Sequence, residues 1–383
     1  MLYLDFYKEL NTAEKYIIIG LILTFLLGGF GDVIPVLGLI VMTIGGVKII
    51  REKGYKEVLN TPLTRPFLLF IFIALFSLIK ITSIRSAFNM FGTLLEIVFG
   101  FFISFYIFKN KSVEFHRKML NILFAGGVIT ALYGIYESFF INPRRLESVI
   151  GNSNLLGVYM LFLFFLSLSV ILQKSYKTKV TGVILFLLFG YNLLFSLSIS
   201  AFLGSITGLL FFFIITNKKI LIVVMLLIIL SPLILPDSLV NRFETTYQSV
   251  KEGNDARIYA WQMFKENPVI GVGIGHFREH YVHPPAPDEE RYYNHSHNIF
   301  LQIMSELGMS GLLSFIFLIF LMVKVFYDAY PFSSDFKGNL CLVFSSAFTG
   351  FFVQSQSEFS LISSAIAVLV GILLGWYIAL LKT

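Results

Sequence analysis

The chain has 383 residues, of which 56% are hydrophobic and only 14% are charged. Soluble globular domains carry about 25% charged residues, so this chain has too few polar side chains to cover a surface that faces water on all sides. Its net charge of +6 comes from basic residues scattered over short joints, which indicates orientation in a membrane and argues against a nucleic-acid partner.

Long apolar runs separated by short polar joints predict an all-α polytopic membrane protein. A helix needs about 20 residues to cross the ~30 Å core of a bilayer, and these runs are too long for the ~10-residue alternating strands of a membrane barrel. No repeat of fixed period is visible, so we expect residues 1–383 to form a single membrane domain. About twelve runs are long enough to cross: 16–31, 33–50, 66–82, 88–108, 119–140, 154–172, 180–198, 200–216, 219–235, 298–326, 338–356 and 359–381.

Lysine and arginine gather in alternate joints, which predicts the orientation of the chain. The positive-inside rule places these joints in the cytoplasm, together with both ends of the chain. A polar loop, 236–297, between the ninth and tenth helices then faces outward. Polar loops of this length are uncommon between membrane helices and are usually functional, so we expect this loop to carry the catalytic site. The basic joints hold Arg51, Lys53, Lys56, Arg65, Lys109, Lys111, Arg117, Lys118, Lys174, Lys177, Lys179, Lys218 and Lys219.

Three arginines lie in short joints that this orientation places outside, where the positive-inside rule does not favour them. They are Arg85, Arg144 and Arg145. Arginine offers a planar fork of donors that fits phosphate oxygens and keeps its charge, so these side chains are candidate phosphate ligands. The alternative is contact with lipid headgroups, or a salt bridge to Glu137 or Glu147.

Within the long loop, Asn254 or Asp255 is placed to cap a helix that includes Arg257. Ile258, Trp261 and Phe264 are expected to share one face of this helix, which would place it along the membrane surface. Pro268 ends the helix, and the glycines of Gly271-Val272-Gly273-Ile274-Gly275 predict a tight turn with close backbone approach.

Histidines in the loop allow a metal site as an alternative. His276, His280 and His283 have spacings of four and three residues, and His295 and His297 follow, so these side chains are candidate ligands for zinc. However, no HExxH motif is present, and two prolines interrupt the helix that these spacings would need. We therefore expect His276, His280 and His283 to be surface residues, and the site to contain no metal. The single cysteine, Cys341, lies in an apolar run and excludes a disulfide within the chain.

The strongest signal for function is an ordered set of residues in the second half of the chain. It consists of Arg257, Trp261, Pro268, Gly271-Val272-Gly273-Ile274-Gly275-His276-Phe277, His297-Asn298, Leu301, Glu306, Gly308 and Gly311. Upstream, Arg145, Gly151-Asn152-Ser153-Asn154 and Gly157 form a second motif. Together these residues resemble the O-antigen ligase and O-antigen polymerase superfamily. The sequence departs from the family at Ser198-Ile199-Ser200-Ala201, where Ser-Arg-Gly is usual, so Arg145, Arg144 or Arg257 would have to supply the missing arginine.

The resemblance implies a glycosyltransferase of the bacterial inner (cytoplasmic) membrane that needs no cofactor. Such an enzyme transfers a glycan from an undecaprenyl-diphosphate-linked donor to a sugar hydroxyl of lipid A-core, with inversion, at the periplasmic face. In the polymerase alternative, the acceptor is a second lipid-linked glycan, as in the assembly of O-antigen or capsular polysaccharide. The alternative from another class is a transporter of lipid-linked oligosaccharides, for which Glu96 and Glu358 are the candidate charges within the spans.

The resemblance also assigns roles to individual residues. His297 is the expected general base, because histidine titrates near neutral pH, although it could instead be an interfacial residue at the start of the tenth span. Arg257 and Arg145, and in addition Arg144 and Arg291, are expected to bind the donor diphosphate. The expected supporting residues are Asn298, Asn152, Asn154, Trp261, Gly273 and Gly275.

Overall fold

The structure is a computed structural model that describes residues 10–80, 82–141, 145–219, 221–222, 225–226, 240–241, 244–245, 256–280 and 294–382. Within these residues all regular structure is helical, as predicted. Nine of the described helices are long and apolar enough to cross a membrane. They are α3 (Val33–Lys53), α6 (Ile84–Phe108), α7 (Val113–Phe140), α8 (Ser153–Ile171), α9 (Tyr176–Phe195), α10 (Ile199–Thr216), α15 (Ile299–Ala329), α16 (Phe336–Gln354) and α17 (Ser364–Leu381).

The predicted count of twelve spans is not confirmed. Helices α2 (Thr12–Leu27) and α5 (Thr64–Phe76) form at two of the predicted runs, but they have only 16 and 13 residues. Most of the predicted run 219–235 lies outside the described residues. The remaining described elements are short: α4 (Lys56–Leu59), η1 (Ser77–Lys80), η2 (Ser148–Ile150), α13 (Ala256–Glu266), α14 (Phe277–His280) and η4 (Ser360–Ile362).

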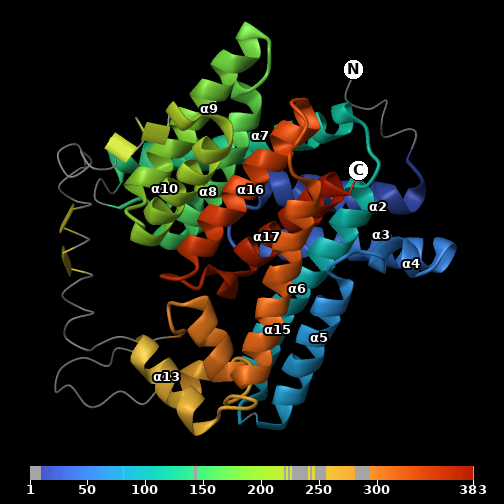
Figure 1. Cartoon of the computed structure of the whole chain (residues 1–383), viewed down its shortest axis with the longest axis vertical. Helices are drawn as coiled ribbons and strands as arrows, with labels where there is room; N and C mark the ends of the chain where they lie inside the picture. Colours follow the sequence, from blue (N-terminus) through green and yellow to red (C-terminus); the bar gives the residue numbers. More distant parts are fainter. Residues whose placement is uncertain are drawn as a thin grey trace.

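Close helix packing holds the bundle together, with α6 against α17, α2 against α3, α8 against α9, and α10 against α16. Small residues permit the closest approaches, as is usual between membrane helices. A Cβ atom added to Gly204 of α10 would lie only 2.5 Å from the carbonyl oxygen of Gly350 of α16. The end of α17 and the start of α2 lie on the same side of the molecule, away from α13 (Figure 1).

The helical conformation of α15 is interrupted at Gly308. Residues 271–275, here called the glycine turn, pair with the backbone groups that this interruption leaves free. Gly308 has φ 65° and ψ −160°, which interrupts the helical hydrogen bonds. The N–H groups of Val272 and Gly273 donate to the carbonyls of Ser305 and Glu306, each at 2.9 Å, so the carbonyls freed by the break are paired. Gly271, Gly273 and Gly275 all have positive φ, in agreement with the predicted tight turn. The turn therefore fixes the segment after α13 against α15.

Helix α13 presents the predicted face only in part. Ile258 and Trp261 are exposed, but Phe264 is buried together with Ala260 and Met263. Helix α13 packs against α15, and the ring of Phe264 lies beside that of Trp261, with 5.3 Å between the ring centroids. The expected cap at Asn254 or Asp255 lies outside the described residues.

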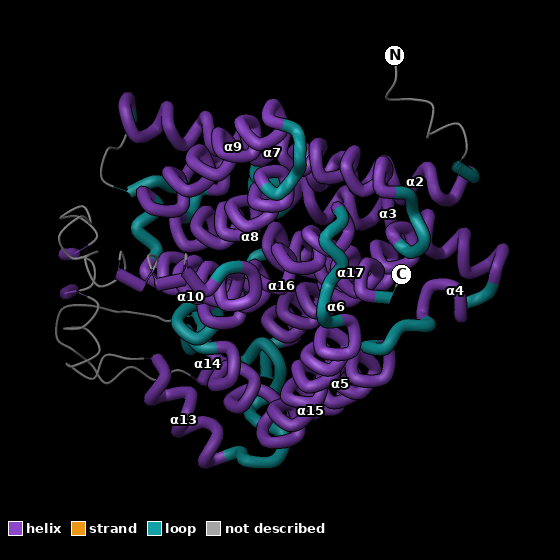
Figure 2. Tube along the Cα trace, turned by 45° about the horizontal axis from the view of Figure 1, so that its top comes forward, coloured by secondary structure: helices purple, strands orange, loops and turns teal. Residues whose placement is uncertain are grey.

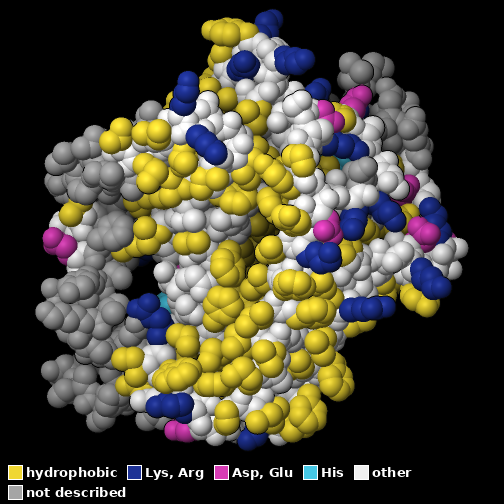
Figure 3. Space-filling view, in the orientation of Figure 1, with side chains coloured by type: hydrophobic (Ala, Val, Ile, Leu, Met, Phe, Trp, Pro, Cys, Tyr) yellow, Lys and Arg dark blue, Asp and Glu magenta, His cyan; other side chains and the backbone are white. Residues whose placement is uncertain are grey.

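The tube trace shows α5 and α15 running side by side, with α13 and α14 next to them (Figure 2). On the face drawn in Figure 3, hydrophobic side chains cover α5 and α15, while lysine and arginine side chains gather over α4 and the start of α9. An exposed apolar surface of this kind is typical of helices that contact lipid.

Candidate active site

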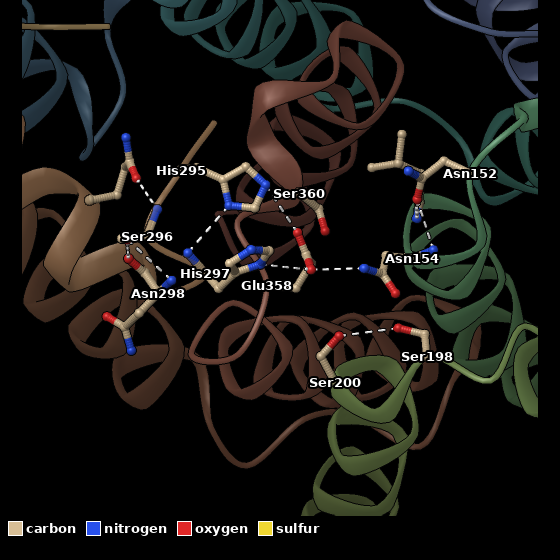
Figure 4. Close-up of polar contacts among 12 residues, drawn as sticks. Asn152, Asn154, Ser198, Ser200, His295, Ser296, His297, Asn298, Glu358 and Ser360 are labelled. Carbon is tan, nitrogen blue, oxygen red and sulfur yellow. Dashed lines mark hydrogen bonds and ion pairs between the residues drawn. The ribbon is translucent and has the colours of Figure 1, made fainter. Parts of the chain in front are cut away.

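Four joints meet at the same end of the helix bundle and bring polar residues together (Figure 4). One joint precedes α8, one separates α9 from α10, one precedes α15, and one separates α16 from α17. These ends are opposite the joints rich in lysine and arginine, because each helix connects one type of joint to the other. The polar centre that they form consists of Glu358, His295, His297, Asn298, Asn152, Asn154 and Arg145.

The turn before α15 carries two of the predicted site residues. Asn298 is the N-cap of α15 and accepts a hydrogen bond from the N–H of Leu301 at 3.0 Å. Its amide also donates to the carbonyl of Gln356 at 3.0 Å, which joins this turn to the joint after α16. His297, directly before this cap, has a positive φ of 54°. Strained backbone of this kind in a non-glycine residue tends to occur at functional sites.

Glu358 lies between the two histidines. Its Oε2 is 3.2 Å from Nδ1 of His297, and its Oε1 is 3.3 Å from Nε2 of His295. The side chains of Glu358 and His295 are 12% and 13% exposed, whereas His297 is 35% exposed. The carboxylate is thus largely removed from water, and His297 is its more accessible neighbour.

The hydrogen bonds define the tautomers of both rings. An ionised carboxylate only accepts hydrogen bonds, so the ring nitrogens that face Glu358 carry protons. Nδ1 of His295 accepts from the N–H of His297 at 3.3 Å, so His295 is a neutral ring protonated at Nε2. In a neutral His297 the proton is on Nδ1, and Nε2 carries the lone pair. This is the tautomer that a general base requires.

Burial and charge set the protonation states around this centre. Burial lowers the pKa of His295 from 6.5 to about 4, with a further contribution from His297 that Glu358 opposes. Burial alone would raise the pKa of the Glu358 carboxyl. The hydrogen bond from His297, the charges of both histidines and the hydrogen bond from Asn154 together lower it below its ordinary value. Glu358 is therefore ionised and His295 neutral near pH 7.

On the other side, Glu358 contacts the start of α8. The amide of Asn154 donates to Oε2 of Glu358 at 2.8 Å, and its carbonyl accepts from Nη2 of Arg145 at 2.9 Å. Asn152 caps α8, because its side chain accepts from the N–H groups of Asn154 and Leu155. A continuous chain of contacts thus joins Arg145 to His297.

Arg145 also lies beside the joint at which the family's usual arginine is replaced. Its Nε donates to the carbonyl of Ser196 at 3.2 Å, two residues before Ser198. The hydroxyls of Ser198 and Ser200, which flank Ile199, lie 3.1 Å apart and are buried. Glu137, which was one alternative partner for an arginine here, accepts from the N–H groups of Glu147 and Ser148.

Two buried residues of α15 connect to the segment 295–298 before this helix, here called the histidine turn, through hydrogen bonds. Oε1 of Gln302 accepts from the N–H of Ser296 at 2.7 Å, and its amide donates to Oε1 of Glu306 at 2.8 Å. Glu306 also accepts from the N–H of Phe277 at 3.2 Å. The glycine turn, α14 and the histidine turn are in this way held together through α15.

The geometry of His295, His297 and Glu358 would also suit a metal ion. Each offers one ligand atom, and these atoms lie within 4.8 Å of one another. Zinc accepts this set of donors. In the hydrogen-bonded arrangement, however, both ring nitrogens that face Glu358 carry protons, and a metal would have to replace them. The set also differs from the predicted alternative, in which His276, His280 and His283 contributed.

His276 is not the surface residue that was predicted. It is fully buried, and its Nε2 accepts from the N–H groups of Thr82 and Ser83 at 3.0 and 2.9 Å. Its Nδ1 lies 2.9 Å from the carbonyl of Ile274. His276 therefore joins the glycine turn to the start of α6. His280 is exposed, as predicted, and His283 lies outside the described residues.

The structure brings together only some of the predicted site residues. His297, Asn298, Arg145, Asn152 and Asn154 belong to the polar centre. The others belong to the segment around α13: Arg257 is half-buried near its start, Trp261 is on its exposed face, and Gly273 and Gly275 form the turn after it. Arg144 and Arg291 lie outside the described residues.

Sequence reasoning did not anticipate that Glu358 and His295 contact each other beside His297. Glu358 was considered only as a charge within a span, but it lies in the joint between α16 and α17. The available signal was a carboxylate in a short polar joint on the same side as His297. His295 was set aside because His297 fits the family motif.

A cavity of about 480 Å³ with mostly apolar walls adjoins the polar centre. Near the centre it is lined by Gln302, Ser355 and Phe359, and along α15 its lining continues from Ile299 to Phe326. Phe359 is the neighbour of Glu358 in the chain. An apolar space that runs along membrane helices and begins beside charged groups suits a ligand with a polar head and a hydrocarbon chain.

The nine spans and the polar centre at one end of the bundle define a polytopic membrane protein with a titratable site beside an apolar cavity. Residues 184–316 match the family model described as O-antigen ligase, so the chain carries an O-antigen ligase family domain and the resemblance is confirmed. Members of this family are membrane glycosyltransferases, ligases or polymerases, that use lipid-linked donors in the biosynthesis of surface polysaccharide. A search of curated proteins finds no match to the chain. The matched region includes His297, whereas Arg145, Asn154 and Glu358 lie outside it.

Proposed function

We propose that this protein is an O-antigen ligase that transfers a glycan from undecaprenyl diphosphate to a sugar hydroxyl of lipid A-core. The observation that carries the proposal is the hydrogen bond between Nδ1 of His297 and the buried carboxylate of Glu358. It orients the imidazole and holds the proton on Nδ1, as a carboxylate does for a catalytic histidine in other enzymes.

In the proposed reaction, His297 acts as the general base. Its Nε2 takes the proton from the acceptor hydroxyl while that oxygen attacks the anomeric carbon of the donor. The bond between the anomeric carbon and the diphosphate oxygen breaks, and undecaprenyl diphosphate leaves with the electron pair. Attack on the face opposite the leaving group inverts the anomeric carbon. The protonated imidazole is stabilised by Glu358. No metal takes part in these steps.

Arginine stabilises the negative charge that grows on the leaving diphosphate. Arg145 is best placed, because its guanidinium is joined through Asn154 to the carboxylate that holds His297. It also lies beside the joint where the family's arginine is replaced by Ile199, so it compensates for that departure. Arg257, Arg144 and Arg291 are the further candidates. One such donor contributes ~2.7–4 kcal/mol to the transition state.

The cavity along α15 accommodates the part of the undecaprenyl chain nearest the diphosphate. Its lining is aromatic and aliphatic over most of its length, and Gln302, Glu306 and Ser355 are among its polar lining residues. A lipid bound there would place its diphosphate between the histidine turn and Arg145. The donor would reach this site from the lipid bilayer.

The positive-inside rule supports an active site at the outer face of the inner membrane. The basic joints lie at the opposite helix ends from the polar centre, and the rule assigns them to the cytoplasm with both chain ends. The loop 236–297, between predicted helices nine and ten, would then be periplasmic and contribute Arg257 and His297 to the site.

The alternative is a polymerase that joins lipid-linked repeats of O-antigen or capsule. The observation in its favour is the spacing of Arg257 and Gly273, which is also found in polymerases of this superfamily. Both reactions use the same donor and the same base, and they differ in the acceptor.

The test is transfer by the purified protein, reconstituted in liposomes with an undecaprenyl-diphosphate-linked glycan. Lipid A-core is offered in one reaction, and only further donor in the other. The proposal predicts that glycan appears on lipid A-core. Longer lipid-linked chains in the second reaction would instead identify a polymerase. A folded protein that forms neither product would contradict both.

A further inference from the structure

We propose that Asn154 is a positioning residue that couples the charge on Arg145 to the basicity of the His297–Glu358 pair. The inference rests on the proposed function, because it assigns Arg145 to the diphosphate and His297 to the acceptor hydroxyl. It adds a role for a residue that neither takes protons nor contacts phosphate.

Both the carbonyl oxygen and the NH₂ group of the Asn154 side chain form hydrogen bonds, and a rotation that exchanges their positions would break both bonds. The carbonyl accepts from Arg145 at 2.9 Å, and the NH₂ group donates to Glu358 at 2.8 Å. Arginine has no acceptor and an ionised carboxylate has no donor. A flipped amide would therefore lose both hydrogen bonds and bring like partial charges together. Arg145 and Glu358 thus fix one orientation of the amide.

The backbone of Asn154 is fixed as well. Asn154 is the second residue of α8, and the side chain of the N-cap Asn152 accepts from its N–H at 2.9 Å. Gly151, in the left-handed conformation with φ 73°, sets the direction in which the chain enters this cap. The following turns of α8 are buried. These contacts anchor the Cα atom from which the amide reaches Arg145 and Glu358.

This arrangement transmits the binding of an anion to the base. The charged groups that face His297 and Glu358 from the described joints are Arg145 and the titratable His295. When a diphosphate neutralises Arg145, the negative charge of Glu358 is less compensated. The imidazolium form of His297 then gains stability, so its Nε2 takes a proton more readily. The base is strengthened when the donor is bound.

Two variants separate the two contacts of Asn154. Asn154→Asp keeps an acceptor for Arg145 but, when ionised, cannot donate to Glu358. Asn154→Leu has a similar size and removes both contacts. Asn121→Asp is the matched control, because Asn121 is an exposed residue of α7.

The first readout needs no activity. Diethyl pyrocarbonate modifies neutral imidazole, so its rate at His297, followed by peptide mass spectrometry across pH, gives the pH midpoint for that residue. We expect Asn154→Asp to raise the midpoint by ~1 pH unit, the size of effect that one added charge produces at this range. Asn154→Leu should raise it by less, and Asn121→Asp should leave it in place. An unchanged midpoint in folded Asn154→Asp protein would overturn the proposal.

The second readout is the pH dependence of glycan transfer in liposomes. In Asn154→Asp, the acid side of the pH profile of kcat should shift to higher pH by the same amount as the midpoint of the modification. A purely structural role would lower kcat without shifting the pH profile. A shifted midpoint in a protein whose wild type transfers no glycan would uphold the coupling and reject the proposed function. Wild-type transfer with no shift in either readout would reject the coupling alone.

Discussion

Oε2 of Glu358 accepts a hydrogen bond from Nδ1 of His297 across 3.2 Å, although 61 positions separate the two residues in the chain. The contact joins the turn before α15 to the joint between α16 and α17. It gives His297 the orientation and the tautomer of a general base, and it places a negative charge where an imidazolium would form. The proposed chemistry depends on this pair.

Replacing the carboxylate should lower the rate of transfer without unfolding the protein. In Glu358→Gln, the side chain keeps one acceptor oxygen, but an NH₂ group replaces the other oxygen, which accepts a hydrogen bond in the wild type. The hydrogen bonds then no longer fix the tautomer of His297. We expect kcat to fall by up to ~10²–10⁴-fold, the range that a positioned base contributes. Transfer in liposomes measures the effect.

The matched control for this variant is Glu147→Gln. Glu147 is an exposed carboxylate near the same end of the bundle, and its backbone N–H donates to Glu137. This variant should retain wild-type kcat. Equal activity in Glu358→Gln and Glu147→Gln would show that the buried carboxylate is not needed.

The stability of the protein should fall as the pH decreases below neutrality. Burial lowers the pKa of His295 from 6.5 to about 4, so between these values the unfolded chain binds more protons than the folded one. The stabilisation is complete above pH ~6.5 and is lost as the pH falls toward ~4. Glu358, whose pKa is also lowered, adds to the loss at the acid end.

Thermal denaturation in detergent at a series of pH values tests this expectation. The apparent Tm of the wild type should decline across the window, and His295→Gln should show a shallower decline. A Tm that rises on acidification, or an equal slope in the two proteins, would contradict the burial of a neutral His295.

The close backbone contact between the glycine turn and α15 should be disrupted by a single added methyl group. Gly271 has φ 67°, and a Cβ atom there would lie 2.3 Å from the carbonyl carbon of Glu306. Gly271→Ala should destabilise the protein by at least ~1–3 kcal/mol, the cost of strained backbone. In Gly92→Ala of α6 the added Cβ meets no atom within 4 Å, so stability should be unchanged or higher. Similar melting curves for both variants would show that the close contact between Gly271 and Glu306 does not contribute to stability.

Transfer should continue in the presence of excess chelator. The three side chains that suit a metal are already connected by hydrogen bonds in a consistent set of tautomers, and the proposed base needs the lone pair on Nε2 of His297. The measurement is the rate of transfer after extended dialysis against EDTA. Activity that disappears and returns with zinc would assign His295, His297 and Glu358 to a catalytic metal instead.

Much of the fold follows from the sequence, because the bilayer restricts what a long apolar run can form. Every backbone polar group in the membrane must be paired within the protein, so such runs become helices. The breaks are harder to anticipate. Gly308 interrupts α15 only because the segment from Pro268 to Gly275 supplies its hydrogen bonds, and this contact arises from the tertiary structure.

The candidate site was only partly predictable for the same reason. His297 and Asn298 are neighbours in a recognisable motif, whereas Glu358 becomes their partner only through the packing of α15 against the joint after α16. Phe264 illustrates a related error. The spacing on α13 places it beside Trp261, where the structure also has its ring, but the spacing does not indicate that Phe264 is buried while Trp261 is exposed.

The most direct test of the account is the rate of a single turnover of glycan transfer in His297→Ala, compared with His280→Ala. His280 is an exposed histidine of α14 and serves as the matched control. Both variants should elute and melt as the wild type does. We predict that His297→Ala loses ~10²–10⁴-fold in rate, as expected when a general base is removed, while His280→Ala stays near wild type. A folded His297→Ala protein with a rate close to wild type would contradict the assignment of His297 as the base.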